Sequence, residues 1–320
     1  MLFDMVLLAV GFACIARGGD LFVDSSVHIG RVFRIPRFVI GGTLVSLATT
    51  MPELVVSATA STLGDSGIAL GNAIGSCICN IGLIVGTVAL ITPVSVDQRD
   101  FANRATWMLA GAILVVALSW NLTISRPMGA LLLSLALVYL FWDYQTIRRI
   151  RDGSKGSERD AEAGELLTRS VLSFLFGAGL IIVGSRFLVT SGQGLATAMG
   201  IPSAIIGFSV VAIGTSLPEL VTGVAAARKG VPDLSLGNIV GANILNLFLI
   251  VGVSGSIQSL SLDRFTQWYA YPWMGVFFLS IVLLVRRTGG IGPKAGMALL
   301  SCYLFRYTSI SSCCCWVYVS

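Results

Sequence analysis

Long apolar stretches alternate with short polar ones along almost the whole chain. A helix that crosses a bilayer needs about 20 mostly apolar residues, and ten stretches approach or exceed that length. They cover residues 2–25, 38–63, 68–91, 104–121, 127–147, 170–192, 204–228, 234–258, 266–285 and 294–310. Their apolar runs are unbroken rather than alternating, which favours helices over the strands of a membrane barrel. The pattern predicts an all-α integral membrane protein with ten transmembrane helices.

One clearly hydrophilic stretch, residues 147–169, divides these spans into two groups of five. It mixes arginine and lysine with acidic residues, and we interpret it as a solvated connection. The first five-helix unit then covers residues 1–155 with the start of this connection, and the second covers 156–310. Residues 311–320 form an atypical, Cys-rich tail to which we assign no role.

The composition supports a membrane location and excludes several other classes of protein. Only 12% of the residues are charged and 55% are hydrophobic, whereas soluble domains carry about 25% charged residues. Cys77 and Cys79 lie inside an apolar stretch and Cys313, Cys314 and Cys315 lie in the tail, so neither group has the spacing of a structural zinc site. With a single His, no nucleophile–base pair or metal triad supports an enzyme, and we expect no cofactor.

The positive charges are unevenly distributed between the two sides of the predicted membrane. Most of the 21 Lys and Arg residues follow odd-numbered spans, including Arg99, Arg104 and the cluster within 147–169, whereas Arg126, Arg264 and Arg306 follow even-numbered spans or lie at a terminus. Because basic loops stay in the cytoplasm, we expect the 147–169 loop inside, both termini outside, and the chain in the inner (plasma) membrane. The first 16 residues lack the basic start of a cleaved signal. The net charge of +5 then reflects topology rather than a nucleic-acid partner.

Two segments of the chain repeat one another at a fixed spacing of 166 residues. The segment from Ile40 to Gly86 aligns without a gap to the segment from Ile206 to Gly252. Each unit has five spans, which is an odd number, so the second copy enters the membrane from the opposite side. Inverted repeats of this kind place a substrate site near the bilayer midplane, on helices interrupted by Gly or Pro.

Two acidic residues lie deep within apolar spans. Of the 16 acidic residues, Glu53 and Glu219 occupy matched positions in the repeat, and the others appear in loops or near helix ends. Charged groups within a membrane are costly and mark ion pathways. Ser46, Thr50 and Glu53 recur at three- or four-residue spacing and share one helical face, and the second repeat places polar residues around Glu219 in the same way.

Further residues of the repeat supply oxygen ligands and close helix contacts. Pro52 and Pro218 precede the acids and free backbone carbonyls one turn earlier. Amide and hydroxyl oxygens recur every four residues on the third span, and the eighth span repeats the two amides; small residues allow helices to approach closely. These positions are Asn72, Ser76 and Asn80 with Gly71 and Gly75, and Asn238, Ala242 and Asn246 with Gly237 and Gly241. An all-oxygen set suits Ca²⁺ and also accepts Na⁺.

The two repeats carry a family resemblance. The segments ATTMPELV and GTSLPELV, each followed by a GNxxG element and a further Asn, resemble the calcium/cation antiporter superfamily, in particular its bacterial sodium/calcium exchanger-like branch. The resemblance covers nearly the whole chain. It implies ten helices, of which the second, third, seventh and eighth form the ion core and the first and sixth slide across it. It also implies exchange of Ca²⁺ for Na⁺ by alternating access.

The resemblance implies roles for individual residues. It assigns Ca²⁺ binding to Glu53, Glu219, Thr49 and Thr215, and Na⁺ binding to Glu53, Glu219, Ser46, Thr50, Ser76, Asn80, Ala212, Ser216 and Asn246. Pro52, Pro218, Gly71, Gly75, Gly237 and Gly241 support the breaks and contacts of the helices. Two departures matter: Ala242 stands where the other repeat has Ser76, and Asn246 stands where potassium-dependent relatives have Asp, which argues against K⁺ cotransport.

Competition for one negative site explains exchange without covalent chemistry. Two carboxylates repel one another unless a cation bridges them, so the empty site is costly to move across the membrane. We expect Ca²⁺ export driven by Na⁺ entry. A Ca²⁺/H⁺ antiporter of the same fold is the alternative, and a passive cation channel is an alternative of another class. The expected partners are the bilayer and the two ions; the oligomeric state stays open.

Overall fold

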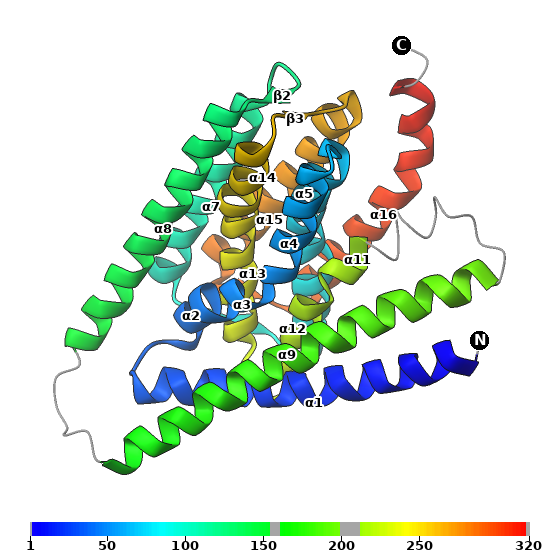
Figure 1. The fold of residues 1–320 in the computed structure, drawn as a ribbon. Coiled ribbons are helices and arrows are strands. Elements are labelled where there is room, and N and C mark those ends of the chain that lie inside the picture. The colour runs from blue at the N-terminus through cyan, green and yellow to red at the C-terminus, as the bar shows by residue number, and fades with distance from the viewer. Residues whose placement is uncertain (1, 154–160, 199–211, 318–320) are drawn as a thin grey trace.

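The computed structural model describes residues 2–153, 161–198 and 212–317, and nearly all of them are helical (Figure 1). The first half contains α1 (Leu2–Val32), α2 (Arg37–Ile40), α3 (Ser46–Thr49), α4 (Met51–Thr62), α5 (Ser66–Cys79), α6 (Gly86–Ile91), α7 (Gln98–Leu118) and α8 (Arg126–Gly153). The second half contains α9 (Ala161–Ala198), α11 (Ala212–Thr215), α12 (Leu217–Arg228), α13 (Pro232–Leu245), α14 (Val251–Ile257), α15 (Tyr271–Thr288) and α16 (Pro293–Val317).

Within the described residues, four π-helical turns join or begin these helices. They are η1 (Gly41–Val45) between α2 and α3, η2 (Asn80–Val85) between α5 and α6, η4 (Asn246–Ile250) between α13 and α14, and η5 (Thr266–Ala270) before α15. A π-helical turn inserts one residue into an α-helix and is frequent at functional sites. The turns η2 and η4 begin at residues that match one another in the repeat, so the same distortion occurs in both halves.

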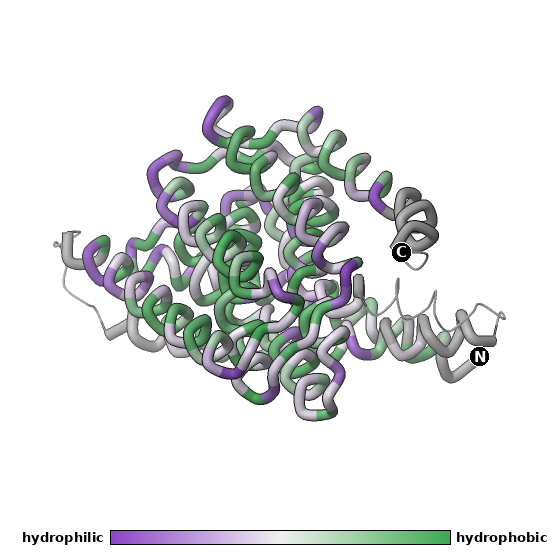
Figure 2. The backbone as a smooth tube through the Cα atoms, turned by 90° about the horizontal axis from the view of Figure 1, so that it is seen from above, coloured by the Kyte–Doolittle hydropathy of each residue, from purple (hydrophilic) through white to green (hydrophobic). Residues whose placement is uncertain are grey.

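The helices have the length and composition of membrane spans. Among the described residues, seven helices are long and apolar enough to cross a bilayer, and eight if the bent pair Arg37–Thr49 and Met51–Thr62 counts as one span. The backbone is apolar or neutral over most of its course, with hydrophilic residues in short stretches (Figure 2). The chain is therefore a mostly helical, multi-pass membrane protein.

Helices α1 and α9 lie side by side and cross the foot of the upright bundle (Figure 1). Small residues allow this pair to pack closely: a Cβ on Gly18 would lie 2.8 Å from the Cβ of Leu180, and one on Gly184 would lie 2.8 Å from the carbonyl oxygen of Gly11. A separate hydrophobic cluster, which includes Phe22 and Phe174, joins the pair to α2 and α12. The larger cluster lies within the bundle, around α5, α13 and α15.

Two short antiparallel strand pairs connect the halves. Strand β1 (Val94–Ser95) pairs with β4 (Gly290–Ile291), and β2 (Thr123–Ile124) pairs with β3 (Leu260–Ser261). Val94 lies opposite Ile291, and Ile124 lies opposite Leu260. Each pair therefore joins a loop of the first half to a loop of the second.

Several helix ends differ from those expected from hydropathy. Helical residues overlap every predicted span, although residues 204–211 of the seventh lie outside the described residues. Helix α7 begins at Gln98 rather than at residue 104, because the Asp97 side chain accepts hydrogen bonds from the backbone N–H groups of Arg99 and Asp100 at 2.8 and 3.0 Å and so caps the helix. Arg104 therefore lies inside a helix and is buried, so its assignment to a loop was wrong.

The hydrophilic connection is also shorter than predicted. Helix α8 continues to Gly153 and α9 begins at Ala161, so much of 147–169 is helical. Arg, Lys and Glu are good helix formers, so they do not end a helix when it leaves the membrane. Two other helices also exceed their predicted spans: α1 continues past residue 25 to Val32, and α16 continues past residue 310 to Val317.

Candidate ion-binding site

The two PEL segments of the repeat lie where a helix is broken. Helix α3 ends and α4 begins around Thr50, with a bend of 42° between the two parts. Ser216 separates α11 from α12 in the same way, and both residues have ψ close to zero (−9° and 8°). Pro52 and Pro218 lie in the first turn after each break, where a missing N–H costs nothing.

The two carboxyl groups lie in the first turns of α4 and α12. The partial positive charge of a helix N-terminus stabilises a carboxylate there. Glu53 and Glu219 are both about 1% exposed, and the two side chains are close enough to interact with one another. One oxygen of each, Oε2, has no hydrogen-bond partner among the described residues. Two adjacent, buried and incompletely paired carboxyl groups require a cation or protons.

Two hydroxyl–amide pairs join the repeats crosswise. Thr49 donates a hydrogen bond from Oγ1 to Oδ1 of Asn238 at 3.1 Å, and Thr215 donates from Oγ1 to Oδ1 of Asn72 at 3.0 Å. Each pair joins the broken helix of one repeat to the partner helix of the other. Asn72 also donates from Nδ2 to the Ser57 hydroxyl at 2.9 Å. The matched pairs thus fix the hydroxyl group that lies four residues before the glutamate of each repeat.

The next pair of positions breaks this symmetry. Ser216 donates from its hydroxyl to the hydroxyl of Ser76 at 3.2 Å. In the repeat, Thr50 corresponds to Ser216 and Ala242 corresponds to Ser76. Ala242 has no hydroxyl group. Thr50 Oγ1 is consequently buried without a hydrogen-bond partner among the described residues.

Amide oxygens complete the set at the start of the matched π-helical turns. Asn80 begins η2 and donates from Nδ2 to Oδ1 of Asn243 at 2.9 Å, while Asn246 begins η4. The Oδ1 atoms of Asn80 and Asn246 are buried and, within the part of the chain that the structure describes, unpartnered. An unpaired polar group in an apolar interior costs on the order of 1–3 kcal/mol. These oxygens are therefore available to bind a cation.

The four glycines of the repeat differ in their surroundings. A Cβ on Gly237 would overlap the carbonyl group of Phe38, and one on Gly241 would lie 2.6 Å from the Ser46 hydroxyl, so α13 packs directly on η1 and α3. A Cβ on Gly71 or Gly75 would meet no described atom within 4 Å. The repeat places their expected contacts at residues 204 and 208, outside the described residues, so close approach at these two glycines stays a prediction.

The remaining predicted residues lie around the same breaks. Ser46 begins α3, is fully buried and accepts the backbone N–H of Thr50 at 2.9 Å, and Ala212 begins α11. Asn243, which orients Asn80, was not predicted from the sequence. Its one signal was a third amide in the eighth span, beside Asn238 and Asn246. Among the described residues, no three His, Cys, Asp or Glu side chains converge on a metal position, so the site consists of two carboxyl groups and neutral oxygens.

Comparisons with known proteins identify the family. The profile described as "Sodium/calcium exchanger protein" matches residues 3–145 and 169–310. The chain belongs to this exchanger family. Members of the sodium/calcium exchanger family are transporters of cations rather than enzymes, in agreement with the resemblance found in the sequence.

Relatives of known name cover almost the whole chain. The sodium/calcium exchanger MaX1 of Methanosarcina acetivorans is 30% identical over 94% of this chain and 96% of its own length. The inner membrane protein YrbG of Escherichia coli is 34% identical over 93% of this chain and 94% of its own length. The solved structure of the sodium-calcium exchanger NCX_Mj, soaked with 10 mM Na⁺ and zero Ca²⁺, superimposes with a TM-score of 0.83 at 30% identity, covering 96% of this chain and 99% of that one.

Proposed function

We propose that this chain exchanges Ca²⁺ for Na⁺ across the inner (plasma) membrane by alternating access and exports Ca²⁺ in the cell. The observation that carries the proposal is the pair of buried carboxyl groups of Glu53 and Glu219, each with one unpartnered oxygen and surrounded by neutral oxygens. Either one Ca²⁺ or several Na⁺ neutralise such a pair, so the two ions compete for one site. The names of MaX1 and NCX_Mj support the same pair of ions.

The neutral oxygens favour Na⁺ over H⁺ as the coupling ion. A proton on Glu53 or Glu219 would neutralise the carboxyl group. It would leave the unpartnered oxygens of Thr50, Asn80 and Asn246 without a ligand, whereas Na⁺ accepts hydroxyl and amide oxygens. The transport experiment described below is therefore designed to distinguish Na⁺ coupling from H⁺ coupling.

The proposed topology is ten spans in two inverted five-helix repeats, with both termini outside and the connection between α8 and α9 in the cytoplasm. The crosswise pairs Thr49–Asn238 and Thr215–Asn72 support a twofold relation between the repeats. The strand pairs support it as well. Strands β1 and β4 follow the third and ninth predicted spans, and β2 and β3 follow the fourth and eighth, so each pair joins loops on one side of the membrane.

Transport into proteoliposomes tests the proposed function. Purified protein is reconstituted, Na⁺ or pH gradients are imposed separately, and uptake of radioactive Ca²⁺ is measured. We expect uptake that requires Na⁺ inside the vesicles and is lost in Glu53→Gln and Glu219→Gln. Uptake that follows a pH gradient and ignores Na⁺ would establish proton coupling, and downhill Ca²⁺ flux without a counter-ion would establish a channel.

A further inference from the structure

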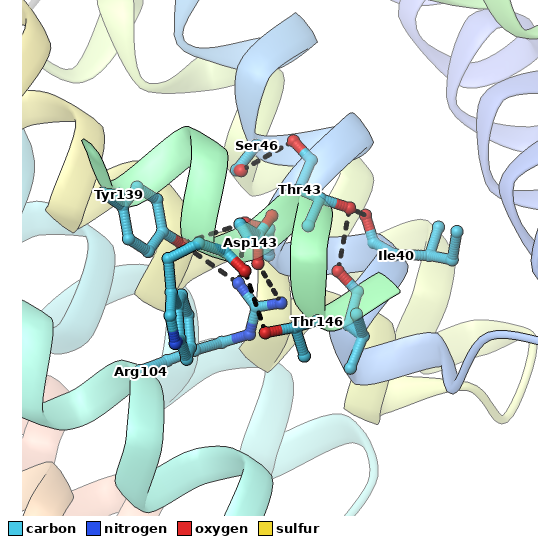
Figure 3. Close-up of polar contacts among 10 residues, drawn as sticks. Ile40, Thr43, Ser46, Arg104, Tyr139, Asp143 and Thr146 are labelled. Atoms are coloured by element: carbon cyan, nitrogen blue, oxygen red, sulfur yellow. Dashed lines mark hydrogen bonds and ion pairs between the residues drawn. The ribbon is translucent and has the colours of Figure 1, made fainter. Parts of the chain in front are cut away.

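A buried ion pair lies outside the ion-binding site, on helices α7 and α8 (Figure 3). Arg104 Nη2 lies 2.6 Å from Asp143 Oδ1, and Arg104 Nη1 donates to the Tyr139 hydroxyl at 3.0 Å. All three side chains are almost completely buried. The guanidinium carbon also lies 6.0 Å from the ring centroids of Phe38 and Trp142. Asp143 is thus a third deeply buried acid, and its place near a helix end in the sequence analysis was wrong.

Such a pair is costly within membrane-spanning helices. Burial removes both charges from water, and a hydrophobic replacement is often as stable as a buried ion pair or more so. Ionisable residues inside a membrane mark functional positions by default. Stability alone therefore does not explain why Arg104 and Asp143 are buried here. Their role depends on which other group of the protein Arg104 contacts.

That atom is a backbone carbonyl in the helix that carries Glu53. In the π-helical turn η1 the N–H of Ser46 donates to the carbonyl of Gly41, five residues earlier, and not to that of Gly42 as in an α-helix. Arg104 Nη1 donates instead to the Gly42 carbonyl at 3.2 Å, and the Tyr139 hydroxyl donates to it at 3.4 Å. A Cβ on Gly42 would lie 2.9 Å from Arg104 Nη1, so a glycine is needed for this approach.

The π-helical turn sets the rotation of the site. Conversion of η1 to an α-helix would return Ser46 N–H to Gly42 and remove the inserted residue. One residue of an α-helix corresponds to a rotation of about 100° and a rise of about 1.5 Å. Ser46 and the residues that follow it, including Thr49 and Thr50, would then point in another direction relative to α2.

We propose that the buried cluster of Arg104, Asp143 and Tyr139 is a positioning device for cation binding: it binds the Gly42 carbonyl, stabilises the π-helical turn η1, and so orients the face of Ser46, Thr49, Thr50 and Glu53. Asp143 keeps the guanidinium in place, and Arg104 supplies the donor. This inference rests on the proposed function for its consequence on transport. Its structural part, the choice between a π-helical and an α-helical turn, is independent of that function.

A double substitution separates positioning from stability. Arg104→Met with Asp143→Leu removes both charges together, so no unpaired charge stays buried. The Ca²⁺ and Na⁺ concentrations for half-maximal exchange are measured in proteoliposomes. Thermal unfolding in detergent measures the stability of the variant, and an experimental structure shows its η1 turn. We expect a folded protein, half-saturation by Ca²⁺ weakened about tenfold or more, the loss typical of removing an outer-shell partner, and Ser46 N–H bonded to Gly42.

The matched control removes another ion pair, between α2 and α13. Arg37 Nε lies 3.0 Å from Asp233 Oδ2, joins α2 to α13 and makes no contact with Gly42 that the structure describes. Arg37→Met with Asp233→Leu should leave both half-saturating concentrations within about twofold, as expected for a partly exposed pair. Equal effects of the two double substitutions would overturn the proposal.

Further outcomes keep the proposal apart from the proposed function. A folded Arg104→Met/Asp143→Leu protein with unchanged half-saturation and an intact η1 turn would overturn the positioning role. If that variant does not fold, Tyr139→Phe retains the ion pair and removes one donor to Gly42, and an unchanged half-saturation there would have the same meaning. Failure of the unaltered chain to exchange Ca²⁺ for Na⁺ would contradict the proposed function, while the backbone hydrogen bond of Ser46 would still decide the structural part.

Discussion

The two repeats carry matched carboxyl groups, but the residues near them on the neighbouring helices differ in charge. In the first, Arg104, Asp143 and Tyr139 hold the Gly42 carbonyl one turn before Ser46. Counted 166 residues further on, the second has Ala270, Phe305 and Ser309, none of which carries a charge. Phe305 is 63% exposed rather than buried. The repeats therefore share their buried carboxyl groups, but the charged cluster of the first repeat has no charged counterpart in the second.

The same difference occurs within the site, at the Ser76–Ser216 pair and its counterpart Thr50–Ala242. One hydroxyl pair is complete and the other lacks a member. The two repeats thus keep the same carboxyl groups and differ in the hydroxyl groups beside them. We therefore expect the two flanking positions of the site to differ in their affinity for Na⁺, and the predictions below test how far the equivalence of the repeats extends.

The largest effect is expected where the repeats are most alike. Glu53→Gln and Glu219→Gln each remove one of two charges that together neutralise Ca²⁺, so each alone should abolish Ca²⁺ uptake into Na⁺-loaded proteoliposomes. Glu→Asp at the same positions retains the charge and serves as the control, with partial activity expected. An uptake that survives either Gln substitution would show that the carboxyl groups are not equivalent.

Glycine substitutions should show whether the two repeats pack alike. Gly241→Ala places a Cβ against the carbonyl of Gly42 and 2.6 Å from the Ser46 hydroxyl. Overpacking costs about 1–3 kcal/mol, so we expect Gly241→Ala to lower the thermal unfolding temperature in detergent. Gly75 is its counterpart in the repeat, and equivalent packing predicts a similar loss in Gly75→Ala. A loss in Gly241→Ala alone would show that the repeats pack differently at this position.

Restoring the missing hydroxyl should make the repeats more alike. Ala242→Ser gives Thr50 Oγ1 a partner and adds one oxygen to the site. A hydrogen bond contributes about 1 kcal/mol, or roughly fivefold in an equilibrium constant, so half-saturation by Na⁺ should strengthen by about that factor. Ser76→Ala is the reverse control and should weaken it. No change in either variant would show that these hydroxyl positions do not contact Na⁺.

The smallest effect is expected at an exposed ion pair that joins the two halves of the chain. Lys229, after α12, lies 2.8 Å from Asp24 Oδ1 and 3.5 Å from Asp20 Oδ1 on α1. Partial burial lowers the pKa of Lys229, but the two carboxylates outweigh this and raise it above its ordinary value. The pair is therefore present at neutral pH and is lost as the pH rises through that raised pKa.

Lys229→Met should lower the free energy of unfolding by less than about 1 kcal/mol, because exposed pairs are screened by water and salt. Unfolding in low and high salt measures the effect, with Lys294→Met as a second exposed lysine for comparison. A loss well above that value, insensitive to salt, would show that Lys229 does more than tether α1.

The sequence predicted the parts of this molecule that repeat. Hydropathy located every helical stretch that the structure describes, and the spacing of 166 residues paired Glu53 with Glu219. It did not predict that Thr49 binds Asn238, because residues on one helical face do not indicate which neighbouring helix they meet. Arg104 was misplaced for a related reason: a hydropathy window counts an arginine as the end of a span and cannot detect that Asp143, on the next helix, neutralises it.

The strand pairs limit the ways in which the molecule can move. Backbone hydrogen bonds join the two halves at two places, in the strand pairs β1–β4 and β2–β3. A rigid-body rotation of one half relative to the second would therefore strain the hydrogen bonds of at least one strand pair. Helices α1 and α9 lie outside both ladders, and their own hydrophobic cluster is separate from that of the bundle. Within the described part of the chain, eight strand residues therefore tie the two halves together, while α1 and α9 contact the bundle through side-chain packing instead.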